Sequence, residues 1–310
     1  MEEKIEIMNL LQSKQVLEHE LQSLAYGSVE IRENESNKYI YVHYREDGVA
    51  LTKYVGEYSD ELYNLVLNNS IKAKQLKKQI REITKKLKQL NYTEEELSEK
   101  VEQNIDFAKR HLVDTIYKQA ILEGVATTFA DTESIIEGGK VNNMTSEDIL
   151  KIVNLKHAWE FILNKNVILS DTNFALLCEI NKMVEEGFYY TAGKVRNTPV
   201  TIGGTTWKPD LPIESVIKEE LEEIFSKELD DIDRAIELLL YTMKKQVFID
   251  GNKRTAVIYS NHYLISKGKG IIAIPAELTE EFKDLLIPYY EGRDEKEIKK
   301  FIKEKCYMSI

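Results

Sequence analysis

Short stretches of alternating apolar and polar residues follow an opening helical stretch of the chain. Three such stretches, separated by turn-rich sequence, lie at Ser28 to Arg32, Tyr39 to Arg45 and Val49 to Val55. Alternation with a period of two, bounded by turns, predicts a three-stranded meander. A sheet of this size is too small to be stable alone, so we expect a helix against it.

The period changes to that of a helix from Ile71 onwards. A second helix is predicted to start at a capping box formed by Thr93 and Glu96 and to continue to Leu112, which gives an antiparallel helical hairpin. The outer side of the first helix is basic, and we favour a solvated surface there over a site for nucleic acid or an acidic partner. The apolar seam and the basic side of that helix are Leu76, Ile80, Ile83, Leu87 and Leu90, and Lys74, Lys77, Lys78, Arg81, Lys85 and Lys88.

The remainder of the chain has mostly helical periodicity. One interruption, from Tyr189 to Pro212, contains β-branched alternation, glycines and prolines, which predicts a β-hairpin or flap. These patterns place a small N-terminal segment at residues 1–113 and a main domain at 114–310. Helices are expected near Thr115 to Glu137, Ser146 to Leu163, Asp171 to Glu185, Ile213 to Ser226, Asp231 to Lys245, Arg254 to Lys267 and Asp294 to Lys305.

Composition narrows the class of protein. The 310 residues are 43% hydrophobic, and the two cysteines, Cys178 and Cys306, are too few for a disulfide framework. Because no apolar run approaches the length of a membrane span, we expect a soluble cytoplasmic protein. The formal net charge of -11 argues against nucleic acid or an anionic membrane as a partner of the whole molecule.

The most specific local signal runs from Gln246 to Thr255. Gly251 and Asn252 stand immediately before an apolar-periodic helix, where consecutive backbone N–H groups and the helix N-terminus attract an anion. Lys253 and Arg254 add positive charge for a phosphate, and Asp250 offers an oxygen ligand for Mg²⁺. The simpler alternative is that Asp250 or Asn252 only caps the helix.

This segment resembles the Fic signature, His-x-Phe-x-(Asp/Glu)-Gly-Asn-(Gly/Lys)-Arg, which often has a second arginine three residues later. Phe248, an anchor of the motif, matches it, as do Asp250, Gly251, Asn252 and Arg254. Three other positions either depart from this signature or follow a less common form of it. Lys253 resembles the Doc-like branch, Val257 stands in the place of the second arginine, and Gln246 stands in the place of the catalytic histidine.

Two further segments resemble parts of Fic proteins. Glu137 and Gly138 resemble the end of the inhibitory helix, whose pattern is Ser/Thr-x-x-x-Glu-Gly/Asn, although Glu133 stands where the Ser/Thr belongs. A glutamate at a helix C-terminus faces the negative end of the dipole, so we expect Glu137 to pair with Arg254 or Lys253. An exposed glutamate before a glycine cap is the alternative. The target-positioning flap is represented by Val195, Arg196, Ile202, Gly203 and Gly204.

The resemblance implies a mainly α Fic-type helical domain with a β-hairpin flap, preceded by a small α+β segment. It also implies transfer of AMP from ATP, with Mg²⁺, to a Ser, Thr or Tyr hydroxyl of a protein target that docks on the flap. Loss of a general base typically lowers the rate by about 10²- to 10⁴-fold, so we expect impaired activity from Gln246.

Several alternatives to this activity remain open. One is a catalytically silent module that binds a nucleotide or partner, and another is Doc-like phosphate transfer in a toxin-antitoxin or defence setting. Gln246 has two further explanations. The protein is an enzyme that uses a different base, or the glutamine was introduced to trap a complex. His262 is two turns inside its helix and points away from the phosphate position, so we expect it to be packed rather than catalytic.

Overall fold

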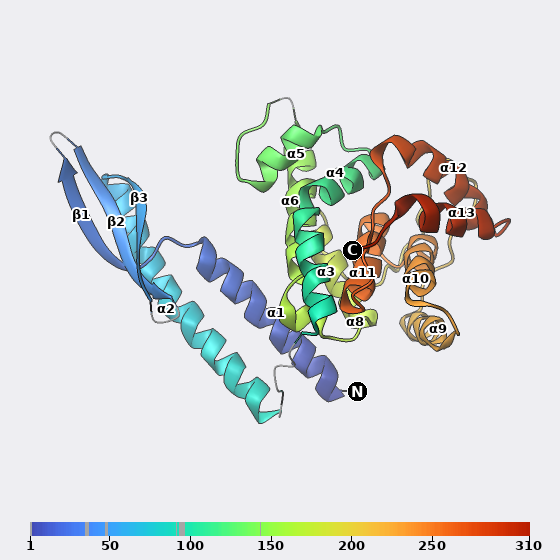
Figure 1. Ribbon diagram of the computed structural model, residues 1–310, viewed down its shortest axis with the longest axis horizontal. Coiled ribbons are helices and arrows are strands. Elements are labelled where there is room, and N and C mark those ends of the chain that lie inside the picture. The colour runs from blue at the N-terminus through green and yellow to red at the C-terminus, as the bar shows by residue number, and fades with distance from the viewer. Residues whose placement is uncertain (1, 35–36, 47–48, 91, 93–96, 143) are drawn as a thin grey trace. The chain divides into compact units, whose positions relative to one another are not determined.

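The computed structural model describes residues 2–34, 37–46, 49–90, 92, 97–142 and 144–310. They fall into two units, Met1–Glu94 and Glu95–Ile310, which are shown in Figure 1. The boundary lies at 94/95, whereas the sequence analysis placed it at 113/114. The difference is helix α3 (Glu99–Arg110), which packs against α11 of the second unit. Among the described helices, none combines the length and the apolar character needed to traverse a bilayer.

The N-terminal unit is a sheet and two helices. Helix α1 (Glu2–Ser23) is followed by β1 (Ser28–Asn34), β2 (Asn37–Glu46) and β3 (Val49–Glu57), which pair antiparallel in that order and confirm the expected meander. The expected helix against the sheet is α2 (Asp60–Gln89), whose buried Val66 packs with Ile40 and Val42 of β2. Residues 35–36 and 47–48 of the expected turns lie outside the described residues.

Helix α2 buries the apolar side and exposes the basic side that its sequence predicts. It begins after Ser59, whose side chain accepts a hydrogen bond from the Leu62 N–H, and its buried seam includes Ala73, Leu76 and Leu87. The helix packs along α1. Among the six cations of the basic side, Lys77 lies over the ring of Tyr26, and the other five are exposed. The expected capping box, Thr93 with Glu96, lies outside the described residues, and α3 starts instead after the N-cap Ser98.

The second unit is almost entirely helical, which confirms the expected fold class. Helix α11 is buried on all sides and contacts α3, α6, α8 and α10, and Figure 1 shows it enclosed by them. The elements around it are α4 (Leu112–Leu122), α5 (Phe129–Ile136), α6 (Ser146–Ile162), α7 (Lys165–Ile168), α8 (Phe174–Val184), α9 (Glu214–Ser226), α10 (Asp231–Lys245), α11 (Asn252–Ser266), β4 (Ile271–Ile272), η1 (Ala276–Leu278), α12 (Thr279–Tyr290), α13 (Lys296–Phe301), η2 (Ile302–Cys306) and β5 (Tyr307–Met308).

Two expectations about the second unit were wrong. The single helix expected from Thr115 to Glu137 is two helices, α4 and α5, because Gly124 turns the chain with a φ of 77° and Thr128 caps a new start. The β-hairpin expected between Tyr189 and Pro212 is an irregular loop without strands. The loop's backbone is held instead by side chains, as described below.

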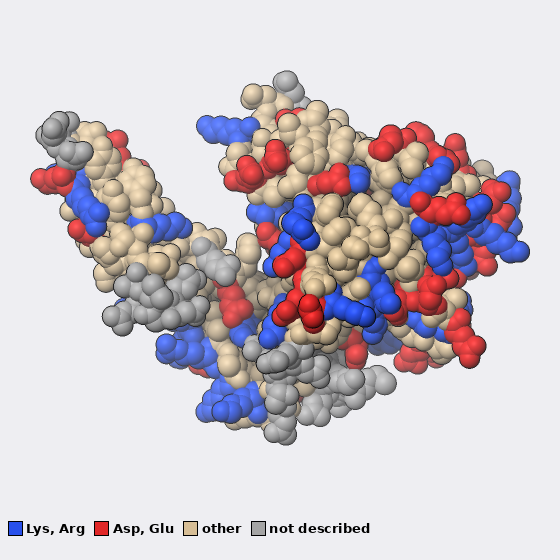
Figure 2. All heavy atoms as spheres, in the orientation of Figure 1, with Lys and Arg blue, Asp and Glu red and all other residues tan. Residues whose placement is uncertain are grey.

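The surface of the C-terminal helices carries both signs of charge. Figure 2 shows blue and red side chains interleaved over this part of the molecule. Lysines of α13 and η2 pair with acids of α10 and α12, as in Lys299–Glu237, Lys303–Asp233 and Lys305–Glu281. Lys299–Glu237 is half-buried, whereas the other two pairs are exposed and contribute little stability each.

Candidate functional site

The site is built on the turn that joins α10 to α11. Gln246 caps the end of α10 in the left-handed region, with a φ of 48°, and it is the one non-glycine residue among the described residues with a positive φ. Gly251 caps the start of α11 with a φ of 70°. A side chain at 251 would also be obstructed, because its Cβ would lie 2.3 Å from Oε1 of Glu185. The turn therefore needs glycine at this position.

Asn252 and Phe248 fasten the turn. The Asn252 amide accepts from the Phe248 N–H at 3.0 Å and donates to the Phe248 carbonyl at 2.9 Å, while the Phe248 ring is fully buried. Asn252 also donates to Oε1 of Gln246 at 3.2 Å, and Gln246 donates from Nε2 to the Met243 carbonyl at 2.6 Å. Both ends of the Gln246 amide are thus used to hold the turn.

The first N–H groups of α11 remain available. Thr255 donates to the Gly251 carbonyl at 2.8 Å, but no described group accepts from the N–H of Asn252, Lys253 or Arg254. Asp250 precedes them, with a half-exposed carboxylate that accepts from the Gly251 N–H at 2.7 Å. Free N–H groups at the positive end of a helix form an anion site.

Carboxylates already engage the two cations of this site. The Arg254 side chain is only 3% exposed, and its Nη2 lies 2.7 Å from Oε1 of Glu185 while its Nε lies 3.4 Å from Oε2 of Glu123. Lys253 Nζ lies 3.2 Å from Oε1 of Glu123. Glu123 and Glu185 were not among the expected site residues.

Burial controls the ionisation of Glu185. Removal from water raises the pKa of its carboxyl to about 7, and the neighbouring charges of Asp250 and Glu123 act in the same direction. The charge of Arg254 opposes the rise without cancelling it. A carboxyl of this kind exchanges a proton near neutral pH.

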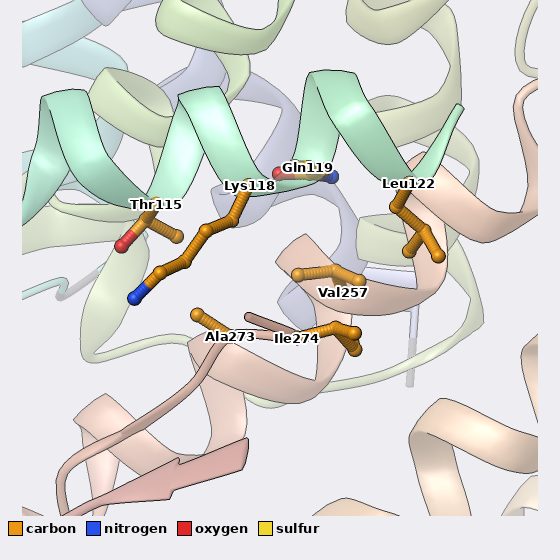
Figure 3. Close-up of a pocket in the computed structure, with 7 residues that line it drawn as sticks. All are labelled: Thr115, Lys118, Gln119, Leu122, Val257, Ala273 and Ile274. Carbon is orange, nitrogen blue, oxygen red and sulfur yellow. The ribbon is translucent and has the colours of Figure 1, made fainter. Parts of the chain in front are cut away.

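Helix α4 is attached directly to the motif. Gln119 donates to the Arg254 carbonyl at 2.7 Å and accepts from Nε1 of Trp159 at 3.0 Å. Figure 3 shows side chains of α4, Leu122 among them, on one side of a narrow apolar space and Val257, Ala273 and Ile274 on the other. Val257 is buried in this seam, so the place of the family's second arginine is filled by core packing.

Arg196 holds the loop between α8 and α9. Its side chain is buried and donates to the carbonyls of Gln246, Thr198 and Asp210 at 2.6, 2.8 and 2.7 Å, and its N–H donates to the Val247 carbonyl at 3.0 Å. Arg196 therefore clamps the loop, whereas the resemblance to Fic proteins implied a place in the target-positioning flap. The other expected flap residues, Val195 and Ile202 (half-buried) and Gly203 and Gly204 (exposed), lie in the same loop.

Residues 171–264 match the model of the Fic/DOC family. These residues carry a Fic domain. Solved structures share its fold: Fic-1 (residues 134–508) from C. elegans has a TM-score of 0.53 at 16% identity, covering 78% of this chain and 79% of that one. A Fic-domain-containing signalling protein from Bacteroides thetaiotaomicron VPI-5482 has a TM-score of 0.51 at 18% identity, with coverages of 61% and 75%. A Fic family protein from Desulfovibrio desulfuricans G20 has a TM-score of 0.52 at 12% identity, covering 67% of this chain and 72% of that one. A search of curated proteins gives no match.

The expected ion pair of Glu137 is not formed in the Fic domain. Glu137 is exposed at the end of α5, and the described ion pairs of Lys253 and Arg254 are made with Glu123, Glu185 and Asp250. Gly138, which follows it, has open space around its Cα. Glu123-Gly124 and Glu137-Gly138 both stand at helix ends, and of these two glutamates Glu123 is the one that forms ion pairs with the cations of α11.

A sequence signal for Glu123 was present but weak. Glu123 is followed by Gly124 and preceded four residues earlier by Gln119, which fits the inhibitory pattern with glutamine in the Ser/Thr place. Glu137 also fits only part of the pattern, because Glu133 stands in the Ser/Thr place. The ion pairs that Glu123 forms with Lys253 and Arg254, rather than the motif, distinguish the two glutamates.

His262 is packed inside the Fic domain, as expected. It is fully buried and contacts the Thr172 hydroxyl through Nδ1 at 2.8 Å and the Val167 carbonyl through Nε2 at 2.9 Å. Burial lowers its pKa to about 4. Its partners occupy both ring nitrogens, so it does not replace a histidine at position 246.

Proposed function

We propose that this Fic domain binds ATP at the N-terminus of α11 and transfers AMP to a protein hydroxyl slowly or not at all. The observation that carries the proposal is the turn before α11, where three free N–H groups and two cations lie beside a glutamine in the place of the family's histidine. The N–H groups and cations suit phosphate oxygens. The glutamine does not suit proton removal.

The expected weakness of transfer follows from the chemistry of Gln246. An amide is not basic near neutral pH, so it orients a target hydroxyl at most and leaves it protonated. Its oxygen already accepts from Asn252 and its nitrogen donates to Met243. These contacts also support a second candidate, a catalytically silent nucleotide-binding or partner-binding module, in which Gln246 is purely structural.

The family implies Mg²⁺, and Asp250 is the residue at this site that could bind it. Asp250 supplies one half-exposed carboxylate, and the described residues contain no cluster of three metal-ligating side chains. Mg²⁺ commonly takes one or two protein carboxylates and completes its shell with water and substrate phosphates. When bound, it would neutralise phosphate charge beside Asp250.

We propose that Glu123 restrains this site. Its two oxygens lie within ion-pair distance of Lys253 and Arg254, the cations that phosphate would need. Both contacts must loosen before the cations turn to a ligand. Lys253 in the Doc-like position also makes phosphate transfer a distinct outcome to be tested.

The test compares ATP labelled at the α-phosphate with ATP labelled at the γ-phosphate, using lysate proteins as targets and the full chain as enzyme. Calorimetry with ATP and Mg²⁺ should show binding by the unmodified chain. Gln246→His should raise α-label transfer by about 10²-fold or more, and Glu123→Gly should raise it further. Glu137→Gly, which removes the matching but exposed glutamate, is the control and should change nothing.

Transfer of the γ-label instead would replace AMP transfer by phosphate transfer. Binding without transfer by any variant would favour the silent module. Rapid transfer by the unmodified chain, unaffected by Gln246→Ala, would contradict the assigned role of position 246.

A further inference from the structure

Glu185 holds an unusual position for a carboxylate. It is the C-cap of α8, at the negative end of that helix, and its side chain is 1% exposed. The carboxylate reaches across to the N-terminus of α11, where it occupies the space that a side chain at Gly251 would fill. Neither the helix end nor burial favours a negative charge here, so the charge depends on Arg254.

The polar atoms between Glu185 and Arg254 are incompletely satisfied. Glu185 Oε1 and the Nε and Nη1 atoms of Arg254 are buried without an aligned hydrogen bond among the described groups, although Oε1 lies 2.7 Å from Nη2. Buried polar atoms of this kind are costly. An anion with several oxygens, placed between Arg254 and the free N–H groups of α11, would satisfy more of them than one carboxylate does.

The charges around the site oppose that anion. Glu123 from α4, Glu185 from α8 and Asp250 from the turn face Lys253 and Arg254, so three carboxylates surround two cations. Lys151 on α6 and Tyr189 after α8 lie near enough to interact with Glu185 electrostatically. Lys151 itself pairs with Glu147 and Asp148, so with all three acids ionised a phosphate or sulfate group meets net negative charge.

We propose that Glu185 competes with oxyanions for Arg254 and the α11 N-terminus, and that an oxyanion binds there when Glu185 takes up one proton from solvent. This inference rests on the proposed function, since the site is the same. It goes further by assigning control of the site to a residue outside the motif and outside α4. The only bond that forms is the O–H bond of the Glu185 carboxyl, and its proton comes from solvent.

The ionisation of Glu185 is consistent with such a switch. Burial, aided by Asp250 and Glu123, raises the pKa of its carboxyl to about 7 against the pull of Arg254. The proton is therefore gained and lost in the neutral range. A bound anion adds negative charge beside the carboxyl and further favours the protonated form.

The experiment measures sulfate affinity of the full chain by calorimetry at about pH 6 and about pH 8, with ionic strength held constant by chloride. Sulfate suits the test because its charge does not change over this range. If binding needs protonated Glu185, affinity should be about tenfold higher at the lower pH, which follows from the protonated fractions on either side of a pKa of about 7.

Variants separate Glu185 from its neighbours. Glu185→Gln should bind sulfate with little pH dependence, at least as tightly as the unmodified chain does at the lower pH. Glu123→Gln should bind more tightly at both pH values but keep the pH dependence. Glu186→Gln, the exposed neighbour, is the matched control and should behave like the unmodified chain.

A measurement on the unmodified chain keeps the test independent of how the variants fold. The buffer dependence of the binding enthalpy at neutral pH should show uptake of about half a proton per sulfate. No proton uptake, or a pH dependence that survives in Glu185→Gln, overturns the inference while sulfate binding itself still supports the phosphate site. Absence of sulfate binding in every variant at both pH values overturns the inference and the proposed phosphate site together.

Discussion

Gln119→Leu is the substitution that most directly tests the attachment of α4 to the Fic motif. Gln119 is buried, and its side chain joins three helices by donating to the Arg254 carbonyl of α11 and accepting from the Trp159 indole of α6. Leucine has a similar volume and no polar atoms. The substitution therefore removes the two hydrogen bonds with little change in packing.

The structure sets the magnitude of the expected effect. Loss of Gln119 leaves the Trp159 N–H, which belongs to a side chain that is 1% exposed, without an acceptor. An unpaired buried donor costs about 1–3 kcal/mol, and loss of the bond to Arg254 costs about 1 kcal/mol more. Burial of the leucine offsets part of this, so we expect the free energy of unfolding to fall by about 2–3 kcal/mol.

Urea unfolding followed by tryptophan fluorescence is the appropriate assay. The two tryptophans, Trp159 and Trp207, both lie in the second unit, so the signal reports on the Fic domain alone. Trp159→Phe removes the donor and keeps Trp207 as the probe. The double variant, Gln119→Leu with Trp159→Phe, should be more stable than the sum of the single losses by about 1–2 kcal/mol, because neither polar group is then left unpaired.

Additive losses would refute this account of Gln119, because the two side chains would then not depend on each other. A loss below about 0.5 kcal/mol in Gln119→Leu, which is typical of surface positions, would show that α4 is held by its apolar contacts alone. A changed dependence on urea concentration would point to a change in the unfolded state instead.

Two further substitutions test parts of the domain outside the phosphate site. Because burial lowers the pKa of His262 to about 4, below its unfolded value of about 6.5, its neutral form contributes stability above about pH 6.5 that is lost as the pH falls towards 4. By linkage, this loss amounts to about 3 kcal/mol, and we expect it to be absent in His262→Asn. Free energies of unfolding that fall in parallel for the two proteins as the pH is lowered would contradict this expectation. Arg196→Ala should lower the free energy of unfolding by about 3 kcal/mol, since a charged donor to three carbonyls is removed, and should speed proteolysis between residues 198 and 210. Arg196→Lys should not restore resistance, because an ammonium group lacks the planar fork, and equal cleavage of all three proteins would argue against a clamp.

The hydrophobic period was sufficient to predict the meander, α10 and the part of α2 from Ile71 onwards, since each buries one side. The first turns of α2, from Asp60, were missed. Helix α10 occupies the expected residues, Asp231–Lys245, because Asp230 provides a cap and Gln246 ends the helix. Helix α12 was missed, and Pro288 in its last turn masks the pattern. Helix α11 is buried all round, so its period alone did not reveal its central position.

The residues of the motif were predictable, but the partners of its cations were not. Five motif residues match in sequence, yet the choice between Glu123 and Glu137 depended on which helix end meets α11. Glu185 carries no sequence signal, because its role arises from contact with Gly251 and Arg254 in space. The alternation between Tyr189 and Pro212 indicated strands, whereas the side chain of Arg196 binds the backbone carbonyls of Thr198 and Asp210 within that segment.

The Arg196 clamp has a consequence for how this domain can diversify. One guanidinium binds the carbonyls of Thr198 and Asp210, so both ends of the chain between them are fixed at a single point, and it binds Gln246 from the same place. Doubling the length of a loop that is pinned at its ends adds only about 0.6 kcal/mol of closure cost. Insertions within residues 199–209 should therefore cost little and leave the geometry at position 246 unchanged, as long as they keep the contacts of Thr205 with Glu291 and of Trp207 with Tyr290.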